Sequence, residues 1–312
     1  MKRPASPLPP RHGLDAARLR LPTEGTWATV RDHLVERLHR LDPRRIDEML
    51  RERRIVGLDG PITLETPYVP GSFIWFHRDL PDEVPVPFEI GVVHRDDHLV
   101  VVDKPHFMAT IPRGKHVLET ALVRLRRDLG LPELSPAHRL DRVTAGLVMF
   151  VARRELRGPY QTLFRDRLVG KEYEAIAPYD PALELPRTVR SRIVKERGVM
   201  TAREVPGEPN AETWVELLEH RDGLGRYRLR PRTGRTHQLR VHMSSLGTPI
   251  LGDTFYPVHR ETPLNDFSRP LQLLAKVLEF TDPLTGERRR FESGATLQAW
   301  TDHAAWQADV LA

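Results

Sequence analysis

Residues 138–147 read HRLDRVTAGL and contain the first group of side chains that could carry out chemistry. One carboxylate, Asp141, lies among three basic residues directly before the apolar run 146–152. A loop at the edge of a strand can hold a side chain rigidly over a cleft, so Asp141 could act as a nucleophile or as a general base. Taken alone, the pattern favours a loop carboxylate that caps a helix or pairs with an arginine.

Residues 231–242 read PRTGRTHQLRVH and form the second group. Four basic side chains fall within eight residues: Arg235, His237, Arg240 and His242. Backbone N–H groups near Gly234, at the head of a following helix, could hold an anion. The stretch is not a P-loop, because the lysine is absent and no earlier glycine has the required spacing.

Residues 171–175 read KEYEA and form the third group. Strand alternation puts Lys171, Tyr173 and Ala175 on one face. A tyrosine in that position could stack on a base or carry a proton, or it could be an ordinary core tyrosine whose hydroxyl is satisfied.

The histidine pairs of the sequence do not predict a metal site. His237 with His242 is one such pair, and His94 with His98 is another. Neither has a third histidine or acidic ligand at a recognised spacing, so structural or surface histidines are expected. The sequence also has no convincing cofactor motif, and we expect the protein to use neither a metal nor a cofactor.

The basic residues are concentrated near the N-terminus. The 312-residue chain has 48 Lys+Arg against 43 Asp+Glu, a net charge of +5, and residues 1–54 alone hold 13 of these cations against 8 acids. Only six of the cations are lysines, and arginine is the better partner for phosphates and bases. A basic module on a neutral body indicates a polyanion partner such as nucleic acid.

The absence of cysteine excludes disulfides, thiolate nucleophiles and iron–sulfur clusters. No apolar run is long enough to span a bilayer, and residues 1–20 are rich in Pro and Arg without an apolar h-region, so we expect a cytoplasmic protein without a membrane partner. The default expectation for the oligomeric state is a monomer.

A small α/β module is predicted at residues 26–78. Its predicted elements are helices at 26–40 and 44–53 and strands at 55–58 and 62–64 around the Asp59-Gly60 turn. A platform this small is suited to binding rather than catalysis. The second helix and its end would present five arginines outward: Arg44, Arg45, Arg51, Arg53 and Arg54.

The flanking segments divide the rest of the chain. Residues 1–25 are rich in Pro and Arg and are expected to be a mobile basic arm. Residues 79–88 carry three prolines and several acids and are expected to be a linker. Residues 89–312 mix short strands and helices, which predicts a single α+β domain with a mixed, mainly antiparallel sheet and flanking helices.

Taken together, the three groups resemble the catalytic motifs of the RluA-type pseudouridine synthases, in the family's order along the chain. Further agreement comes from Val102-Asp103-Lys104-Pro105, from residues 247–253 with Tyr256, and from residues 280–287. The resemblance covers residues 89–295, about two thirds of the chain. More loosely, residues 26–78 resemble the S4-like RNA-binding module that many members carry in front.

The resemblance implies an isomerase that breaks the bond between ribose C1′ and uracil N1, turns the base and rejoins it through C5. It assigns the action at the sugar to Asp141, by attack at C1′ or by removal of the 2′ proton. It implies that Arg235 pairs with Asp141 and keeps it charged, and that Tyr173 stacks on the uracil. Leu239 would pack on the other side of the base.

The resemblance also implies residues that handle the RNA. Arg139 would occupy the space left by the flipped nucleotide. His138 would order the loop, and Lys171 would contact a phosphate or form a structural pair. The N-terminal arginines would add phosphate contacts and help to choose the site, with ribosomal RNA as the favoured target and transfer RNA as the other.

Three positions depart from the family's pattern. Phe107 stands where glycine is common, Ala145 where serine is common and Leu274 where histidine is common. These changes affect local loop geometry and leave the expected catalytic residues in place.

Three other readings were compared with this one. A catalytically dead RNA-binding or assembly protein would not need Asp141, Tyr173 and Arg235 together. A glycosidic-bond hydrolase would need a second acid, for which Asp253 is the only candidate beside a motif. A kinase-like loop, suggested by His138-Arg139, fails because Asp does not directly follow Arg and no Gly-rich loop precedes it.

Overall fold

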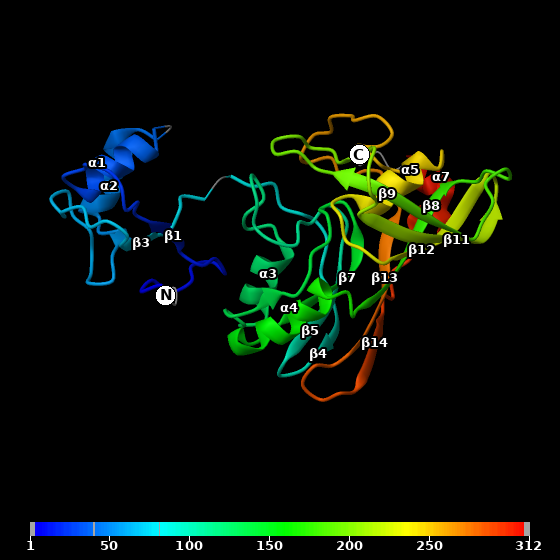
Figure 1. The fold of residues 1–312 in the computed structure, drawn as a ribbon, viewed down its shortest axis with the longest axis horizontal. Coiled ribbons are helices and arrows are strands. Elements are labelled where there is room, and N and C mark those ends of the chain that lie inside the picture. Colours follow the sequence, from blue (N-terminus) through cyan, green and yellow to red (C-terminus); the bar gives the residue numbers. More distant parts are fainter. Residues whose placement is uncertain (1–3, 40, 81, 309–312) are drawn as a thin grey trace. The chain divides into compact units, whose positions relative to one another are not determined.

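The computed structural model describes residues 4–39, 41–80 and 82–308. The chain divides into two compact units, Met1–Asp82 and Glu83–Ala312. Figure 1 shows the first in blue and cyan and the second from cyan to red. The boundary lies inside the predicted linker.

The N-terminal unit has two helices and a three-stranded antiparallel sheet in the order β1-β3-β2. Its elements are β1 (Ala17–Arg20), α1 (Val30–Arg37), α2 (Pro43–Arg51), β2 (Ile55–Val56) and β3 (Phe73–Phe76). The start of α1 is fixed by a capping box, in which the Thr29 hydroxyl accepts from Asp32 N and the Asp32 carboxylate accepts from Thr29 N. Both predicted helices are confirmed. The first begins four residues later than predicted, and its predicted end, Arg40, lies outside the described residues, while the second begins one residue earlier and ends two residues earlier than predicted. The predicted strand at 62–64 is not formed, although Ile62 N donates to Ile55 O.

β1 lies within the segment that the sequence predicted to be a mobile arm. It pairs with β3 from Ala17↔Phe76 to Arg20↔Phe73. Leu19 and Leu21 pack into the apolar core of the unit, and Leu21 is fully buried. The mobile-arm prediction is therefore wrong for residues 17–21. Their alternation of apolar and basic residues is that of a half-buried strand.

The predicted linker is held by hydrogen bonds within each unit. In the N-terminal unit, Asp79 accepts from Arg45 and Arg54. In the second unit, Glu83 accepts from the backbone N–H groups of Val117 and Leu118. Asp79 and Glu83 are therefore each held within their own unit, and Pro81 of the predicted linker lies outside the described residues.

The second unit is built on an 11-stranded sheet with the path β10-β9-β11-β12-β8-β13-β7-β5-β4, while β14 pairs with β13 and β6 with β7. The strands are β4 (Gly91–Arg95), β5 (Leu99–Lys104), β6 (Ser135–Pro136), β7 (Ala145–Val151), β8 (Gly170–Pro178), β9 (Arg187–Val194), β10 (Arg203–Val205), β11 (Ala211–Arg221), β12 (Leu224–Pro231), β13 (Leu273–Thr281) and β14 (Arg288–Glu292). Among these strands only β7 and β13 pair in parallel. The predicted mixed, mainly antiparallel sheet is confirmed.

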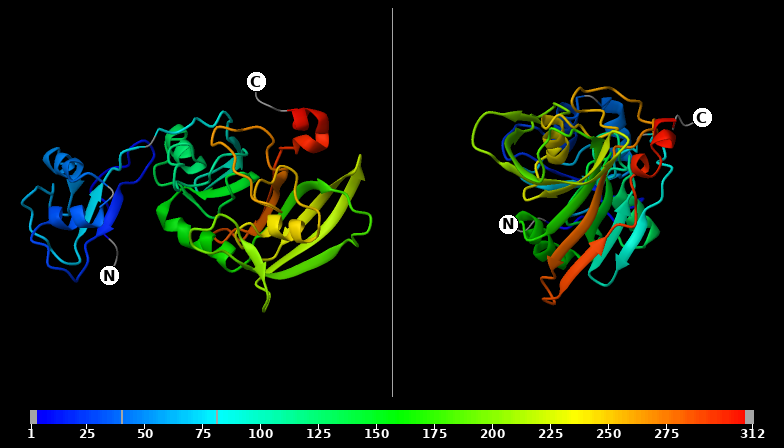
Figure 2. Two further views of the ribbon diagram at one scale, coloured as in Figure 1. Left: turned by 90° about the horizontal axis from the view of Figure 1, so that it is seen from above. Right: turned by 90° about the vertical axis from the view of Figure 1, so that its right-hand side faces the viewer.

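Helices flank this sheet. They are α3 (Ala121–Asp128), α4 (Arg157–Arg165), α5 (Gln238–Ser245), α6 (Gln298–Thr301) and α7 (His303–Ala308), with a 3-10 turn at Arg154–Leu156. Figure 2 shows β13, in orange, between the cyan-to-green half of the sheet and the yellow-green half. Among the described helices, none has the length and apolar character needed to cross a membrane.

Helices on both faces of β7 fix the strand that follows the Asp141 loop. Val148 and Phe150 pack in one cluster with residues of α3, and Leu147 and Met149 in another with residues of α4. All four side chains are fully buried, and each contributes about 1.5–3 kcal/mol of hydrophobic stabilisation. On the other half of the sheet, Leu239 of α5 packs with residues of β8 and β12.

Candidate active site

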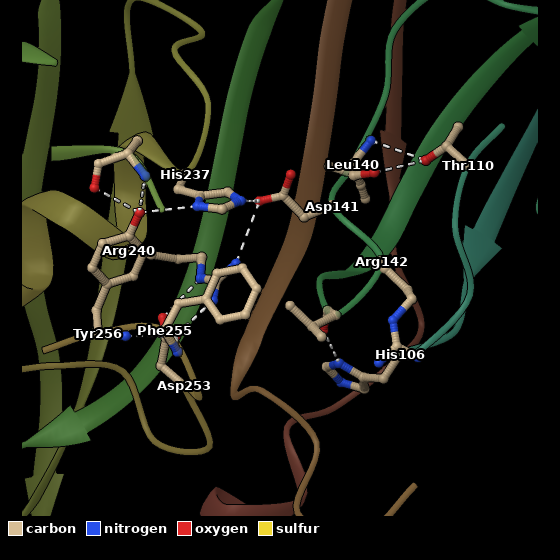
Figure 3. Close-up of polar contacts among 12 residues, drawn as sticks. His106, Thr110, Leu140, Asp141, Arg142, His237, Arg240, Asp253, Phe255 and Tyr256 are labelled. Carbon is tan, nitrogen blue, oxygen red and sulfur yellow. Dashed lines mark hydrogen bonds and ion pairs between the residues drawn. The ribbon is translucent and has the colours of Figure 1, made fainter. Parts of the chain in front are cut away.

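Asp141 lies in the loop that leads into β7, and this loop is held at several points (Figure 3). The Thr110 hydroxyl donates to Leu140 O at 2.9 Å and accepts from Leu140 N at 3.1 Å. The His106 ring bonds to Val143 O at 2.8 Å, and Asp141 O accepts from Thr144 N at 3.1 Å. These contacts fix the backbone on both sides of the carboxylate.

Gly146 allows the loop to approach β13 closely. Its φ is +106°, and a Cβ at this position would overlap the backbone of Ala275 in β13. The parallel pairing of β7 with β13 therefore requires glycine here. It brings the loop of Asp141 next to the centre of the sheet.

Two basic side chains from residues 231–242 face the Asp141 carboxylate. Asp141 Oδ2 lies 3.8 Å from Arg240 Nη1 and 3.8 Å from His237 Nε2. The Asp141 side chain is 36% exposed, whereas that of Arg240 is 2% exposed. A partly open carboxylate thus lies beside a buried guanidinium, and Figure 3 shows both basic groups directed at it.

A second carboxylate orients Arg240. Asp253 accepts from Arg240 Nε at 2.8 Å and from Nη2 at 2.6 Å, which leaves Nη1 for Asp141. Phe255 and Tyr256 lie with their rings about the guanidinium, at 4.9 and 5.4 Å from its carbon. Burial alone would lower the pKa of Arg240, but the bonds and charge of Asp253, with the charge of Asp141, raise it overall. Arg240 is therefore a permanent cation.

The predicted pairing of Asp141 with Arg235 is wrong. Arg235 is exposed, and its Nε donates to Asn210 O at 3.1 Å. Arg235 lies in the turn before α5, while Arg240 lies in the first turn of that helix. Side chains of a helix point toward its N-terminal end, which here faces the catalytic loop.

His237 contacts the Asp141 carboxylate, although its sequence pattern predicted only a structural or surface histidine. It precedes α5 in a left-handed conformation, with φ of 56° and ψ of 19°. Its Nδ1 lies 2.9 Å from the Tyr256 hydroxyl, which also bonds to the backbone of Ala202. Burial is the largest effect on the pKa of His237 and lowers it, while the charge of Asp141 acts in the opposite direction. Smaller effects come from Arg240 and Lys195, which lower the pKa, and from Asp253, which raises it. The ring is fixed between the carboxylate and the hydroxyl.

Tyr173 and Leu239, the two residues expected to hold the base, belong to one apolar cluster. Tyr173 is on β8, opposite Leu229 of β12 and Ala275 of β13. Burial first, and then the charge of Asp141, raise the pKa of Tyr173. The phenol therefore keeps its proton at neutral pH.

Arg139 and His138 occupy different environments although they are adjacent. Arg139 is exposed, and within the described residues it forms no ion pair. The His138 ring stacks on Phe164 with centroids 4.3 Å apart, and its Nε2 accepts from Met149 N at 3.1 Å. The His138 ring is therefore held against Phe164 and β7, whereas the Arg139 side chain is exposed.

Phe107 stands where glycine is common in the family, and the structure explains how a phenylalanine is accommodated there. Its φ is +63°, a conformation that glycine adopts without cost and that costs other residues about 1–2 kcal/mol. Its ring is buried against Phe88 and Phe267 and lies under the Arg142 guanidinium. Burial of a phenylalanine contributes about 1.5–3 kcal/mol, which offsets the strain.

Two of the five predicted RNA-binding arginines are engaged within the N-terminal unit. Arg45 and Arg54 both pair with Asp79, at 2.9 and 2.6 Å. Arg44, Arg51 and Arg53 are exposed, without an ion pair in the described part of the chain. The predicted basic surface is therefore reduced to these three.

Over residues 4–39, 41–80 and 82–308, no three or more His, Asp or Glu side chains converge as metal ligands would. His242, one of the candidates from the sequence, bonds to Ser191 and Thr213 instead.

The pKa of His138 predicts a measurable pH dependence of stability. Burial first, and then the charge of Lys171, lower it from 6.5 to about 3. Below pH 6.5 the His138 side chain of the unfolded chain binds a proton, whereas that of the folded chain stays neutral down to about pH 3. The free energy of unfolding therefore falls as the pH falls from 6.5 towards 3. The loss is about 1.4 kcal/mol per pH unit.

The variant His138→Gln keeps an acceptor for Met149 N and removes this titration. We expect its urea-unfolding free energy, measured from pH 6.0 to 4.5, to fall less steeply than that of the wild type by about 1.4 kcal/mol per unit. The exposed His259→Gln is the control and should keep the wild-type slope. Equal slopes for His138→Gln and the wild type would contradict the assignment.

The sheet and the site together define a class of protein. Residues 98–245 match the family described as RNA pseudouridylate synthase. Among solved structures, human RNA pseudouridylate synthase domain containing 1 matches with a TM-score of 0.56 and 25% identity, over 69% of this chain and 87% of that one. The fold is therefore that of the pseudouridine synthases.

Curated relatives define the family more closely. The dual-specificity RNA pseudouridine synthase RluA of Pasteurella multocida (strain Pm70) is 34% identical over 220 residues, which are 65% of this chain and 92% of that protein. RluA of Escherichia coli (strain K12) is 32% identical over 218 residues, with the same coverage. The chain belongs to the RluA-type family of RNA pseudouridine synthases, which are isomerases that convert uridine to pseudouridine in RNA.

Proposed function

We propose that Asp141 performs the chemistry at the ribose of the target uridine. The observation that carries this assignment is the partly exposed Asp141 carboxylate 3.8 Å from the buried Arg240 guanidinium. Whether the carboxylate attacks C1′ or removes the 2′ proton, it must be ionised while the bound RNA excludes water. A fixed cation at this distance favours the ionised form and opposes the effect of desolvation.

Asp253 acts by orienting Arg240, and His237 acts by direct contact with the Asp141 carboxylate. The bidentate Asp253–Arg240 pair fixes the direction of Nη1, and a preoriented group costs no reorganisation during the reaction. His237 lies against the same carboxylate oxygen and is itself fixed by Tyr256. Both are positioning residues for Asp141. Asp253 is buried and paired with Arg240, so it is not available to act as the second acid of a glycosidic-bond hydrolase.

Tyr173 and Leu239 retain the uracil while it turns. The freed base needs flat, apolar surfaces on which to rotate, and a tyrosine ring with a leucine side chain provides them. Because its pKa is raised, Tyr173 is a poor general base at neutral pH. Its role is stacking, and we assign the removal of the C5 proton to another group.

Arg139 enters the RNA when the base leaves it. Flipping a nucleotide out of a stack costs a few kcal/mol, and a side chain that fills the gap offsets part of this cost. Arg139 is exposed on the same loop as Asp141, two residues before it. An arginine can stack on bases and bind phosphates, so it suits both contacts.

The N-terminal unit supplies further contacts to RNA. Arg44, Arg51 and Arg53 remain available for phosphates, and such contacts set position rather than sequence. We propose structured ribosomal RNA as the target, with transfer RNA as the second candidate. The relatives named dual-specificity RNA pseudouridine synthase RluA match 65% of this chain, so about a third of it lies outside the match and could alter the target.

Position-resolved mapping of pseudouridine tests the proposal. RNA from cells with and without this protein would be compared across ribosomal and transfer RNA. We expect specific ribosomal positions to lose pseudouridine when the protein is absent and to regain it when purified protein is added. Sites confined to transfer RNA would overturn the choice of target, and release of free uracil would overturn the reaction. Mass alone cannot follow the product, because the two nucleosides are isomers.

A further inference from the structure

A basic cleft of about 570 Å³ opens where α4 leads into β8. Five cationic residues line it: Arg167, Lys171, Arg230, Arg232 and Arg290. Two acids, Glu172 and Glu279, also line it. Three of the five cations are paired with carboxylates: Arg230 with Glu172, Arg232 with Glu212 and Arg290 with Glu292. The excess of positive charge in the cleft therefore comes from Arg167 and Lys171.

The two acids of the cleft are paired with arginines. Glu172 accepts from Arg228 at 2.9 Å and from Arg230 at 3.0 Å. Glu279 accepts from Arg288 at 2.8 Å. These carboxylates are thus neutralised by their own partners and do not balance Arg167 or Lys171.

Arg167 and Lys171 bring two like charges together without a counter-ion among the described residues. The Lys171 ammonium donates to Thr233 O at 3.5 Å, a long hydrogen bond to a neutral group. Burial first, and then the charge of Arg167, lower the pKa of Lys171. Converging cations that the protein leaves unbalanced are typical of an anion site.

The cleft adjoins the catalytic strand. Lys171 lies two residues before Tyr173 on the same face of β8, a separation of about 7 Å along a strand. Its charge also acts on His138, which supports the loop of Asp141. An anion held at Lys171 would therefore lie within a nucleotide or two of a base stacked on Tyr173.

We propose that this cleft binds a backbone phosphate of the RNA strand next to the flipped nucleotide, with Lys171 and Arg167 as its ligands. The proposal rests on the proposed function, since RNA is the polyanion that the site must hold. Lys171 supplies a point charge and Arg167 a planar fork, the two ways in which proteins bind phosphate. The contact positions the strand and does not read its sequence.

Arg167→Gln is the principal test, because Arg167 is exposed and its loss should not affect folding. Lys171→Met is the second variant. Arg154→Gln is the matched control, since Arg154 is an exposed arginine near the start of α4 that does not line the cleft. The probe is total RNA from cells that lack the protein. Its retention by the protein and its conversion to pseudouridine are measured at about 50–200 mM KCl, a range over which the affinity of phosphate contacts changes strongly.

Each phosphate contact contributes about 0.7 to the slope of log affinity against log salt on single strands. We expect Arg167→Gln and Lys171→Met each to reduce this slope by about 0.7 and to weaken binding at low salt by about 3- to 10-fold. With saturating RNA, the control Arg154→Gln should form pseudouridine at a rate within about twofold of the wild type, because Arg154 is exposed and does not line the cleft.

Three outcomes would overturn the proposal. The first is an Arg167→Gln protein with the slope and affinity of Arg154→Gln. The second is a wild-type protein that shows no salt-dependent binding of RNA. The third is an Arg167→Gln protein that binds normally and has lost the reaction. A wild-type protein that binds RNA with the expected slopes but forms no pseudouridine would instead contradict the proposed function and leave the phosphate site supported.

Discussion

Asp141→Asn is expected to lower the rate of pseudouridine formation by at least about 10³-fold, because it removes the one carboxylate placed at the ribose. The amide keeps the shape of the side chain but can neither attack C1′ nor take a proton. RNA binding should stay within about threefold of the wild type, since phosphate contacts supply most of the affinity. Single-turnover conversion and RNA retention measure the two effects separately.

The stability of Asp141→Asn separates this result from a folding defect. Arg240 remains paired with Asp253, so no uncompensated cation is left in the core. The unfolding free energy should change by less than about 1 kcal/mol. Asp97→Asn is the control, because Asp97 is 87% exposed in its side chain and lies outside the site. Substantial activity in Asp141→Asn would rule out the mechanism, and loss of RNA binding would assign Asp141 to recognition.

The sequence motifs identified the catalytic loop but not the partner of its carboxylate. Both Arg235 and Arg240 lie in the stretch 231–242, and nothing in their spacing shows which one faces Asp141. The choice depends on where α5 begins, which is at Gln238. One residue more or less of helix turns a side chain by about 100°. A motif therefore locates a site more reliably than it assigns a contact.

His237 was missed because its role depends on an unusual backbone conformation. A non-glycine residue with positive φ is uncommon, and its sequence gives little sign of it. The signal that was present is its position between Arg235 and Arg240 in the same motif. The contacts with Tyr256 and Asp141 join residues that are 19 and 96 positions apart, as their numbers in the chain show.

Local composition misled the prediction at the two ends of the N-terminal unit. Proline and arginine suggested a mobile arm, yet β1 is held by pairing with β3 some 56 residues later. Acids and prolines suggested a linker, yet Asp79 and Glu83 are both used as hydrogen-bond acceptors. Strand pairing and charge neutralisation are tertiary effects that override local preference. The mixed, mainly antiparallel sheet of the second unit, by contrast, was predicted correctly.

Arg240→Met is expected to cost about 3–5 kcal/mol of unfolding free energy, because it leaves the Asp253 carboxylate buried without its cation. It should also lower pseudouridine formation by at least about 10²-fold, since Asp141 loses the charge that keeps it ionised. Urea unfolding and single-turnover conversion measure the two losses. A folding defect alone could produce both, so a second variant is needed.

The double variant Arg240→Met with Asp253→Asn removes the buried charge together with its partner. We expect it to recover much of the stability, because a neutral amide is left in place of an unpaired carboxylate, and to remain inactive. The exposed Arg235→Met is the matched single variant, with a stability change within about 0.5 kcal/mol and activity within a few-fold of the wild type. An active double variant, together with an inactive Arg235→Met, would show that Arg235 is the cation that keeps Asp141 ionised. The reverse pattern, an inactive double variant with an active Arg235→Met, would assign the role to Arg240, which lies 3.8 Å from Asp141.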